Sequence, residues 1–201
     1  MTAHAHPTEQ VNSKQGRILV QLARETIMKK LGQPISADEQ RGLAAALDDP
    51  IFHEKGATFV TLTRHGQLRG CIGSLSAVQP LGQNVRRNAE NAAFHDPRFA
   101  PLTPAEAEQV EIEVSVLTAP RPLTYTDADD LMATLRPGED GVIIRKGAAG
   151  ATFLPQVWDQ LPDPVDFLTH LCLKAGLSGQ AWRDTRLDVS IYQVQYFKEG
   201  G

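Results

Sequence analysis

Apolar residues recur at helical spacing in several stretches of the chain. The stretch after Ser13, taken as the helix cap, predicts a helix that runs to Leu31 and stops at Gly32, because glycine readily adopts the left-handed conformation that closes a helix. A second helix should follow Ser36, where Ser-Ala-Asp-Glu forms a capping box. Further helices are predicted over residues 78–95, 127–135 and 163–175.

Elsewhere apolar and polar positions alternate, which predicts strands. Residues 57–72 form a hairpin whose turn is His65-Gly66. Residues 110–117 give the strongest strand, with aliphatic side chains on one face and Glu111, Glu113 and Ser115 on the other. Additional strands are predicted over residues 141–146, 151–154 and 190–197. Because the hairpins are mixed with helices and show no βαβ alternation, the pattern indicates an α+β fold with a mainly antiparallel sheet.

Length and composition narrow the class of protein. A chain of 201 residues is sized for one domain, here residues 13–197, with predicted tails at 1–12 and 198–201. The net charge of -4 argues against a nucleic-acid partner, which usually demands a basic surplus. No apolar run approaches a membrane span, the N-terminus lacks the apolar core of a signal peptide, and the two cysteines form no disulfide framework. We therefore expect a cytoplasmic protein with free thiols and no membrane association.

Six segments, in order along the chain, resemble the AMMECR domain family. They are LRGCIG (68–73), AAFHDPRF (92–99), EIEVSVL (111–117), GEDGVII (138–144), FLPQV (153–157) and HLCLKAGL (170–177). The resemblance covers about residues 14 to 197. It implies a two-lobed single domain in which a mainly antiparallel sheet is flanked by helices and a cleft separates the lobes.

The resemblance also implies a setting, although the family has no established reaction. Its prokaryotic members often accompany, or are fused to, a Memo-family domain and a radical S-adenosylmethionine protein. Such proteins are therefore the expected partners, together with an unknown small molecule or peptide. This chain has no three-cysteine cluster of its own for an iron–sulfur centre, and we predict no cofactor.

Cys71 is the leading candidate for chemistry. Residues two apart on a strand share a face, so Arg69 and Cys71 should project together, and a nearby cation favours the reactive thiolate. Gly70 and Gly73 would let a ligand or another backbone come close. His95, at a helix C-terminus, is a candidate proton donor or a simple cap. The structural alternative for Cys71 is a small buried cysteine in a glycine-kinked strand.

Polar side chains around this segment are candidates for binding. Glu113 could pair with Arg69 if their strands are close, and such a pair would weaken the effect of Arg69 on Cys71. Three asparagines follow one helix stripe towards His95 and could form a polar wall of a cleft, although an ordinary wet helix face is the simpler explanation. The candidate binding residues beyond the two glycines are Asn84, Asn88, Asn91, Glu113, Ser115 and Gln156. Asp96 and Arg98 should fix the loop after that helix.

His170 and Cys172 do not form a metal site in this interpretation. Residues two apart on a helix point about 200° from each other. Cys172 instead joins an apolar stripe and should be a packing residue, so we predict no metal.

Two functions are compatible with these residues. One is an enzyme or enzyme-associated protein that depends on the Cys71 thiol and acts on a small molecule or peptide in the cleft. The other is a non-catalytic module that binds a ligand or a protein through the same segment.

Overall fold

The structure is a computed structural model that describes residues 11–200. The chain divides into two compact units, one containing residues up to Thr118 and from Gln195 onwards, the other Ala119–Val194. Each unit has helices and a four-stranded antiparallel sheet. The α+β prediction is therefore confirmed, and the cleft between lobes stays a prediction.

In the first unit the sheet has the order β2-β1-β3-β8, so β1 is central and β2 is an edge strand. The strands are β1 (Ala57–Arg64), β2 (Gln67–Gly73), β3 (Val110–Leu117) and β8 (Val194–Lys198). The helices are α1 (Ser13–Lys30), α2 (Ala37–Ala46), α3 (Leu81–Phe94), the short α4 (Pro104–Ala107) and the 3-10 turn η1 (Pro50–Phe52). The turn of the predicted hairpin is confirmed, because His65 and Gly66 both have positive φ, at 52° and 74°.

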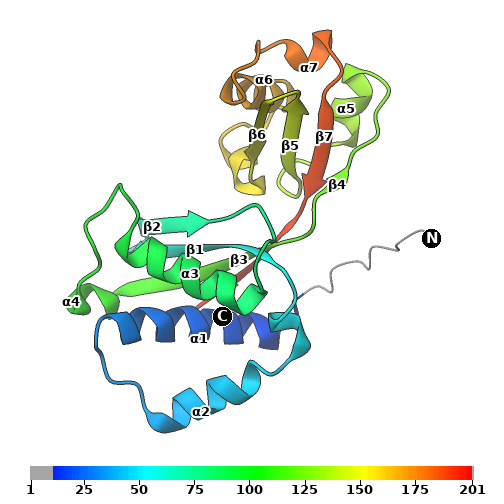
Figure 1. Ribbon diagram of the computed structural model, residues 1–201. Coiled ribbons are helices and arrows are strands. Elements are labelled where there is room, and N and C mark those ends of the chain that lie inside the picture. The colour runs from blue at the N-terminus through cyan, green and yellow to red at the C-terminus, as the bar shows by residue number, and fades with distance from the viewer. Residues whose placement is uncertain (1–10, 201) are drawn as a thin grey trace. The chain divides into compact units, whose positions relative to one another are not determined.

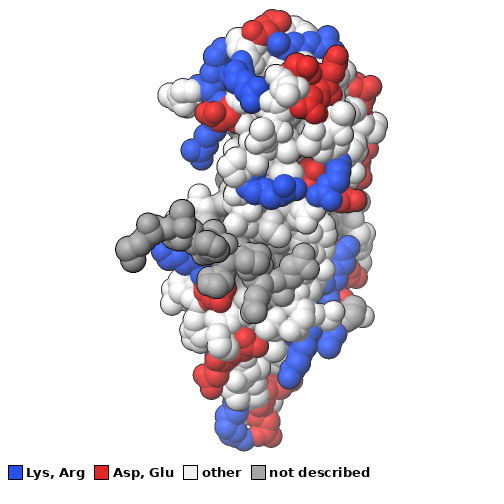
Figure 2. All heavy atoms as spheres, turned by 90° about the vertical axis from the view of Figure 1, so that its right-hand side faces the viewer, with Lys and Arg blue, Asp and Glu red and all other residues white. Residues whose placement is uncertain are grey.

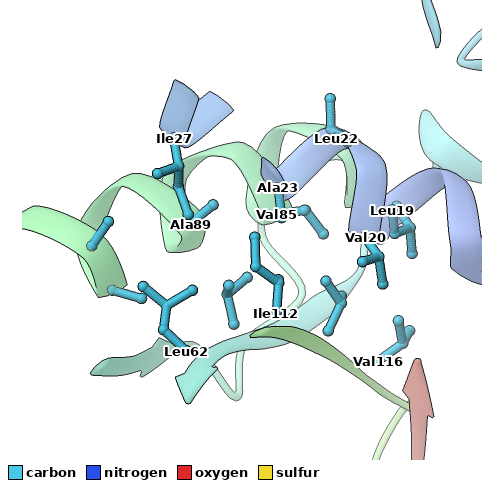
Figure 3. Packing of buried hydrophobic residues seen from close by; sticks show 14 of the residues in the cluster. Leu19, Val20, Leu22, Ala23, Ile27, Leu62, Val85, Ala89, Ile112 and Val116 are labelled. Carbon is cyan, nitrogen blue, oxygen red and sulfur yellow. The ribbon is translucent and has the colours of Figure 1, made fainter. Parts of the chain in front are cut away.

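The core of this unit lies between one face of the sheet and the helices α1 and α3 (Figure 1). Figure 3 shows Val20 and Ile27 of α1, Val85 of α3 and the strand residues Leu62 and Ile112 pointing into it. All five side chains are buried. The alternation of β1 and β3 therefore leaves their odd-numbered residues on the opposite face, away from these helices.

In the second unit the sheet has the order β4-β7-β5-β6. Its strands are β4 (Arg121–Pro122), β5 (Gly141–Lys146), β6 (Ala149–Phe153) and β7 (Asp188–Tyr192). Its helices are α5 (Ala128–Thr134), α6 (Pro164–Lys174), α7 (Ala181–Asp184) and the 3-10 helix η2 (Pro155–Asp159). Trp158 stacks on Phe167 with ring centroids 3.6 Å apart in the core. Cys172 is buried in the same core, which confirms that it is a packing residue.

Several predicted boundaries need correction. The predicted last strand, 190–197, is two strands: β7 belongs to the second sheet and β8 to the first. The cap of α1 is Asn12 rather than Ser13, in a capping box with Gln15. The predicted tail at 198–201 begins later, because Lys198 ends β8 and the Glu199 carboxylate accepts hydrogen bonds from Arg24. Residues 1–10 of the predicted N-terminal tail lie outside the described residues.

Charge and hydropathy add two findings. Figure 2 shows basic and acidic side chains interspersed on the face that it draws. Within residues 11–200, no helix is long and apolar enough to cross a membrane.

Candidate functional site

Cys71 lies in a row of side chains that crosses three strands of the first sheet. Its partner on β1 is Thr61, whose partner on β3 is Glu113. The row lies on the face away from α1 and α3, because the neighbouring residues of β1, Val60 and Leu62, are buried in the core. The Thr61 hydroxyl donates a hydrogen bond to the Cys71 sulfur at 3.3 Å, and the thiol is half-buried. Cys71 is therefore not the fully buried cysteine of the structural alternative.

The loop after α3 holds the backbone of Cys71 on its free side. The Cys71 N–H donates to the Asp96 carboxylate at 2.9 Å, and Arg98 Nη2 donates to the Cys71 carbonyl at 3.2 Å. Asp96 also accepts from the backbone N–H and the guanidinium of Arg98, so the two residues form one brace. The prediction that they fix this loop is confirmed. Because β2 is an edge strand, the brace satisfies backbone groups that no further strand pairs.

The charge state of the brace follows from its contacts. Asp96 is buried, yet the hydrogen bonds from Arg98 hold the pKa of its carboxyl well below the usual range. The same contact raises the pKa of Arg98. Both groups are therefore charged at neutral pH, and the pair is a fixed ionic clamp on β2.

Arg69 does not take the position beside Cys71 that regular alternation along β2 predicts. The pairing shifts between Leu62 and Thr63, which leaves Arg69 in a bulge without a strand partner. Its guanidinium donates to both oxygens of Glu106, at 3.1 Å each. The suggested pairing of Glu113 with Arg69 is wrong, because Glu113 pairs with Lys198 instead, at 3.2 Å.

The two glycines of the segment serve close packing. A Cβ on Gly70 would lie 2.2 Å from the Ala92 carbonyl oxygen of α3. A Cβ on Gly73 would overlap the Phe59 ring. The close approach predicted for these positions therefore involves the chain itself.

The asparagine stripe divides into two parts. Asn84 and Asn88 are buried and form a closed network with Thr58 of β1, in which Asn88 Nδ2 donates to the Thr58 carbonyl at 2.9 Å and to the Asn84 side chain at 2.9 Å. Asn91 is half-buried, and His95 is exposed at the C-terminal cap of α3. The structure thus brings Asn84 and Asn88 together within the core rather than on an open wall.

The remaining candidates lie apart from this network. Ser115 is buried on β3, beside Phe59 in the strand register. Gln156 is exposed in η2 of the second unit. Within residues 11–200, no group of three or more His, Cys, Asp or Glu side chains is placed to hold a metal ion.

Sequence reasoning missed two residues that shape the site. Glu106 carries a recognisable signal, because Thr103-Pro104-Ala105-Glu106 is a capping box at the start of α4. Thr61 lies on the polar side of an alternating strand, but only the register with β2 identifies it as the neighbour of Cys71.

Comparison with known proteins decides the family. The profile of the AMMECR1 family matches residues 20–197. The chain belongs to the AMMECR1 family. A protein of Thermofilum pendens is 38% identical to it over 200 residues, which cover 94% of this chain and 92% of that protein. A protein of Methanothermobacter thermautotrophicus is 38% identical over 188 residues, covering 93% and 95% of the two chains.

A solved structure supports the same assignment. The crystal structure of an uncharacterized protein from Pyrococcus horikoshii superposes with a TM-score of 0.76 at 32% identity, and it covers 94% of each chain. The resemblance inferred from the six segments is confirmed. The AMMECR1 fold thus extends over both units of this chain.

Proposed function

We propose that this AMMECR1 protein binds a small molecule or a peptide on the sheet face that carries Cys71, Thr61 and Glu113. One observation supports this most strongly: the backbone of Cys71 is clamped by Asp96 and Arg98 while its thiol is half-buried on a polar face. A side chain on a fixed backbone loses less conformational freedom when a ligand arrives, so its contacts contribute more to affinity.

Thiol chemistry is the second candidate. The hydroxyl of Thr61 donates to the sulfur, and such a donor favours negative charge on it during nucleophilic attack. No histidine donates to or accepts from this sulfur among the hydrogen bonds of residues 11–200, so the contacts favour binding over catalysis. His95 as a proton donor and Arg69 as an activator stay predictions.

Alkylation of the native protein tests the site. Iodoacetamide followed by mass spectrometry should label Cys71 first, and Cys172 only after urea unfolding, because Cys172 is buried. Fragments detected by NMR should shift the amides of Thr61 and Glu113, and alkylation of Cys71 should abolish those shifts. A Cys71 that stays unlabelled until unfolding, or fragments that bind equally well after labelling, would refute the proposed site.

The same experiment separates the two candidates. A thiol used in chemistry should react with iodoacetamide faster at neutral pH than N-acetylcysteine does, and Thr61→Val should slow it. A thiol used for binding alone should react no faster than N-acetylcysteine. Arg69→Ala tests the predicted activator: a slower reaction supports that role, and an unchanged rate agrees with Arg69 donating to Glu106 rather than to the sulfur.

The resemblance to the AMMECR family motivates a proposal for the partners, and the two free cysteines motivate one for the location. We propose a cytoplasmic setting with Memo-family and radical S-adenosylmethionine proteins as partners. Co-purification of tagged protein with each of these two partner classes tests this, with the Asp96→Ala variant as a control for the integrity of the β2 edge.

A further inference from the structure

Two arginines at the turn end of the first hairpin share one carboxylate. Arg69 donates from Nε and Nη2 to the two Glu106 oxygens, and Arg64 Nη1 donates to Glu106 Oε1 at 3.3 Å. Two guanidinium groups therefore face one carboxylate, and the cluster carries a surplus positive charge. This surplus is local, because the chain as a whole has a net charge of -4.

One donor of this cluster has no partner. Arg69 Nη1 is buried and makes no hydrogen bond, alone in this respect among the buried side-chain nitrogen and oxygen atoms of residues 11–200. The Phe99 ring lies 5.8 Å from Arg69 Cζ, and a ring face is a weaker acceptor than an oxygen. A buried charged donor without a partner is costly, so a bound anion there would stabilise the cluster.

A hollow lies beside these arginines. It has a volume of about 400 Å³ and is lined by Arg64, His65, Gln67, Leu68 and Arg69. Four of the five lining side chains carry nitrogen donors, and they come from both strands and from the turn. Gln67 is exposed and Arg64 half-exposed, so both side chains are accessible to a ligand in the hollow.

We propose that this hollow is a binding site for a phosphate group, held by Arg64 and Arg69. Phosphate fits better than a planar carboxylate, because a tetrahedral anion accepts hydrogen bonds from donors that converge from several directions. Glu106 pairs with both arginines and keeps them oriented, but its single negative charge neutralises just one of them. The site does not depend on the function proposed for Cys71.

An NMR titration tests the site with inorganic phosphate as the probe, at a constant ionic strength of about 150 mM so that screening does not change. The amides of His65 and Gln67 and the Arg69 Nε resonance should shift with saturation. A parallel titration with glycerol 3-phosphate decides between the free ion and a phosphate monoester. Tighter binding of the ester identifies a phosphorylated small molecule, and equal or weaker binding identifies phosphate itself.

Arg64→Gln should weaken phosphate binding by roughly fivefold or more, while it leaves the Arg69–Glu106 pair intact. Gln67→Glu should weaken it too, because Gln67 lies opposite Arg64 in the strand register and a carboxylate there would compete with phosphate for the arginine. The matched control is Arg41→Gln, an exposed arginine on α2 that is paired with Asp38. Shifts that do not saturate, or that persist unchanged in both hairpin variants, would overturn the proposal. These outcomes are independent of Cys71 labelling.

Discussion

The Asp96 carboxylate lies 2.9 Å from the backbone nitrogen of Cys71, twenty-five residues earlier in the chain. This contact ties the loop after α3 to the free edge of β2. It occupies a backbone donor that an unprotected edge strand would offer to another chain. The Asp96 side chain therefore fixes the backbone at Cys71 and makes its contact there rather than with the sulfur.

The brace should be important for stability. Asp96→Ala leaves the Cys71 N–H without its acceptor and removes the carboxylate partner of Arg98, so we expect a loss of about 2–4 kcal/mol in the free energy of unfolding. Urea denaturation measures the loss. Asp38→Ala, at an exposed ion pair on α2, should change stability by about 0.5 kcal/mol or less. Equal effects of the two substitutions would contradict the proposed brace.

Acid should weaken the Arg69–Glu106 contact. The hydrogen bonds from Arg69 lower the pKa of Glu106 from 4.5 to about 2 in the folded protein. A lowered folded-state pKa means that the contribution of this carboxylate is complete above about pH 4.5 and is lost as the pH falls towards about 2. Glu106→Gln should therefore be less stable than the wild type at neutral pH, and the difference should shrink in this window. Urea midpoints at several pH values give the two curves, and parallel curves would contradict the prediction.

Position 70 should not tolerate a side chain larger than that of glycine. A Cβ there would lie 2.2 Å from the Ala92 carbonyl oxygen, which belongs to the helix backbone and cannot move aside alone. We expect Gly70→Ala to cost about 1–3 kcal/mol in thermal or urea unfolding. Gly42→Ala is the matched control, because it meets open space on α2 and should stabilise the helix by about 0.5–1 kcal/mol. A neutral Gly70→Ala would show that β2 and α3 are not tightly packed.

The buried and half-buried asparagines of α3 should behave differently. Asn88→Ala removes the donor to the Thr58 carbonyl and to Asn84, both of which are buried. We expect a loss of about 1–3 kcal/mol. Asn91→Ala on the same helix should cost well under 1 kcal/mol. If Asn91 proved the more sensitive of the two in urea unfolding, the network would not be the structural element inferred.

Cys172 should contribute through packing alone. Burial raises the pKa of its thiol, and its side chain fills the core of the second unit. Cys172→Ala should cost on the order of 1 kcal/mol or more through a small cavity. Fragment binding at the Cys71 face should be unchanged. Loss of that binding with unaltered stability would contradict this assignment.

Local patterns in the sequence determined most of the elements. Capping at Ser36, the His65-Gly66 turn and the alternation of residues 110–117 depend on neighbours a few positions apart, so they are visible in the sequence. The same holds for the family, since six short segments in order carried the resemblance that the profile confirmed. Cys71 could be singled out in the same way.

Tertiary structure alone decided what surrounds Cys71 and where the last strand divides. The bulge at Arg69 depends on the register between β1 and β2, and it directs the guanidinium to Glu106. The division of residues 188–198 depends on where each half finds strand partners, because β7 pairs with β4 and β5 in one sheet and β8 lies next to β3 in the other. Both are contacts between segments distant in sequence, and a local pattern of apolar and polar residues contains no information about which distant segment will be the partner.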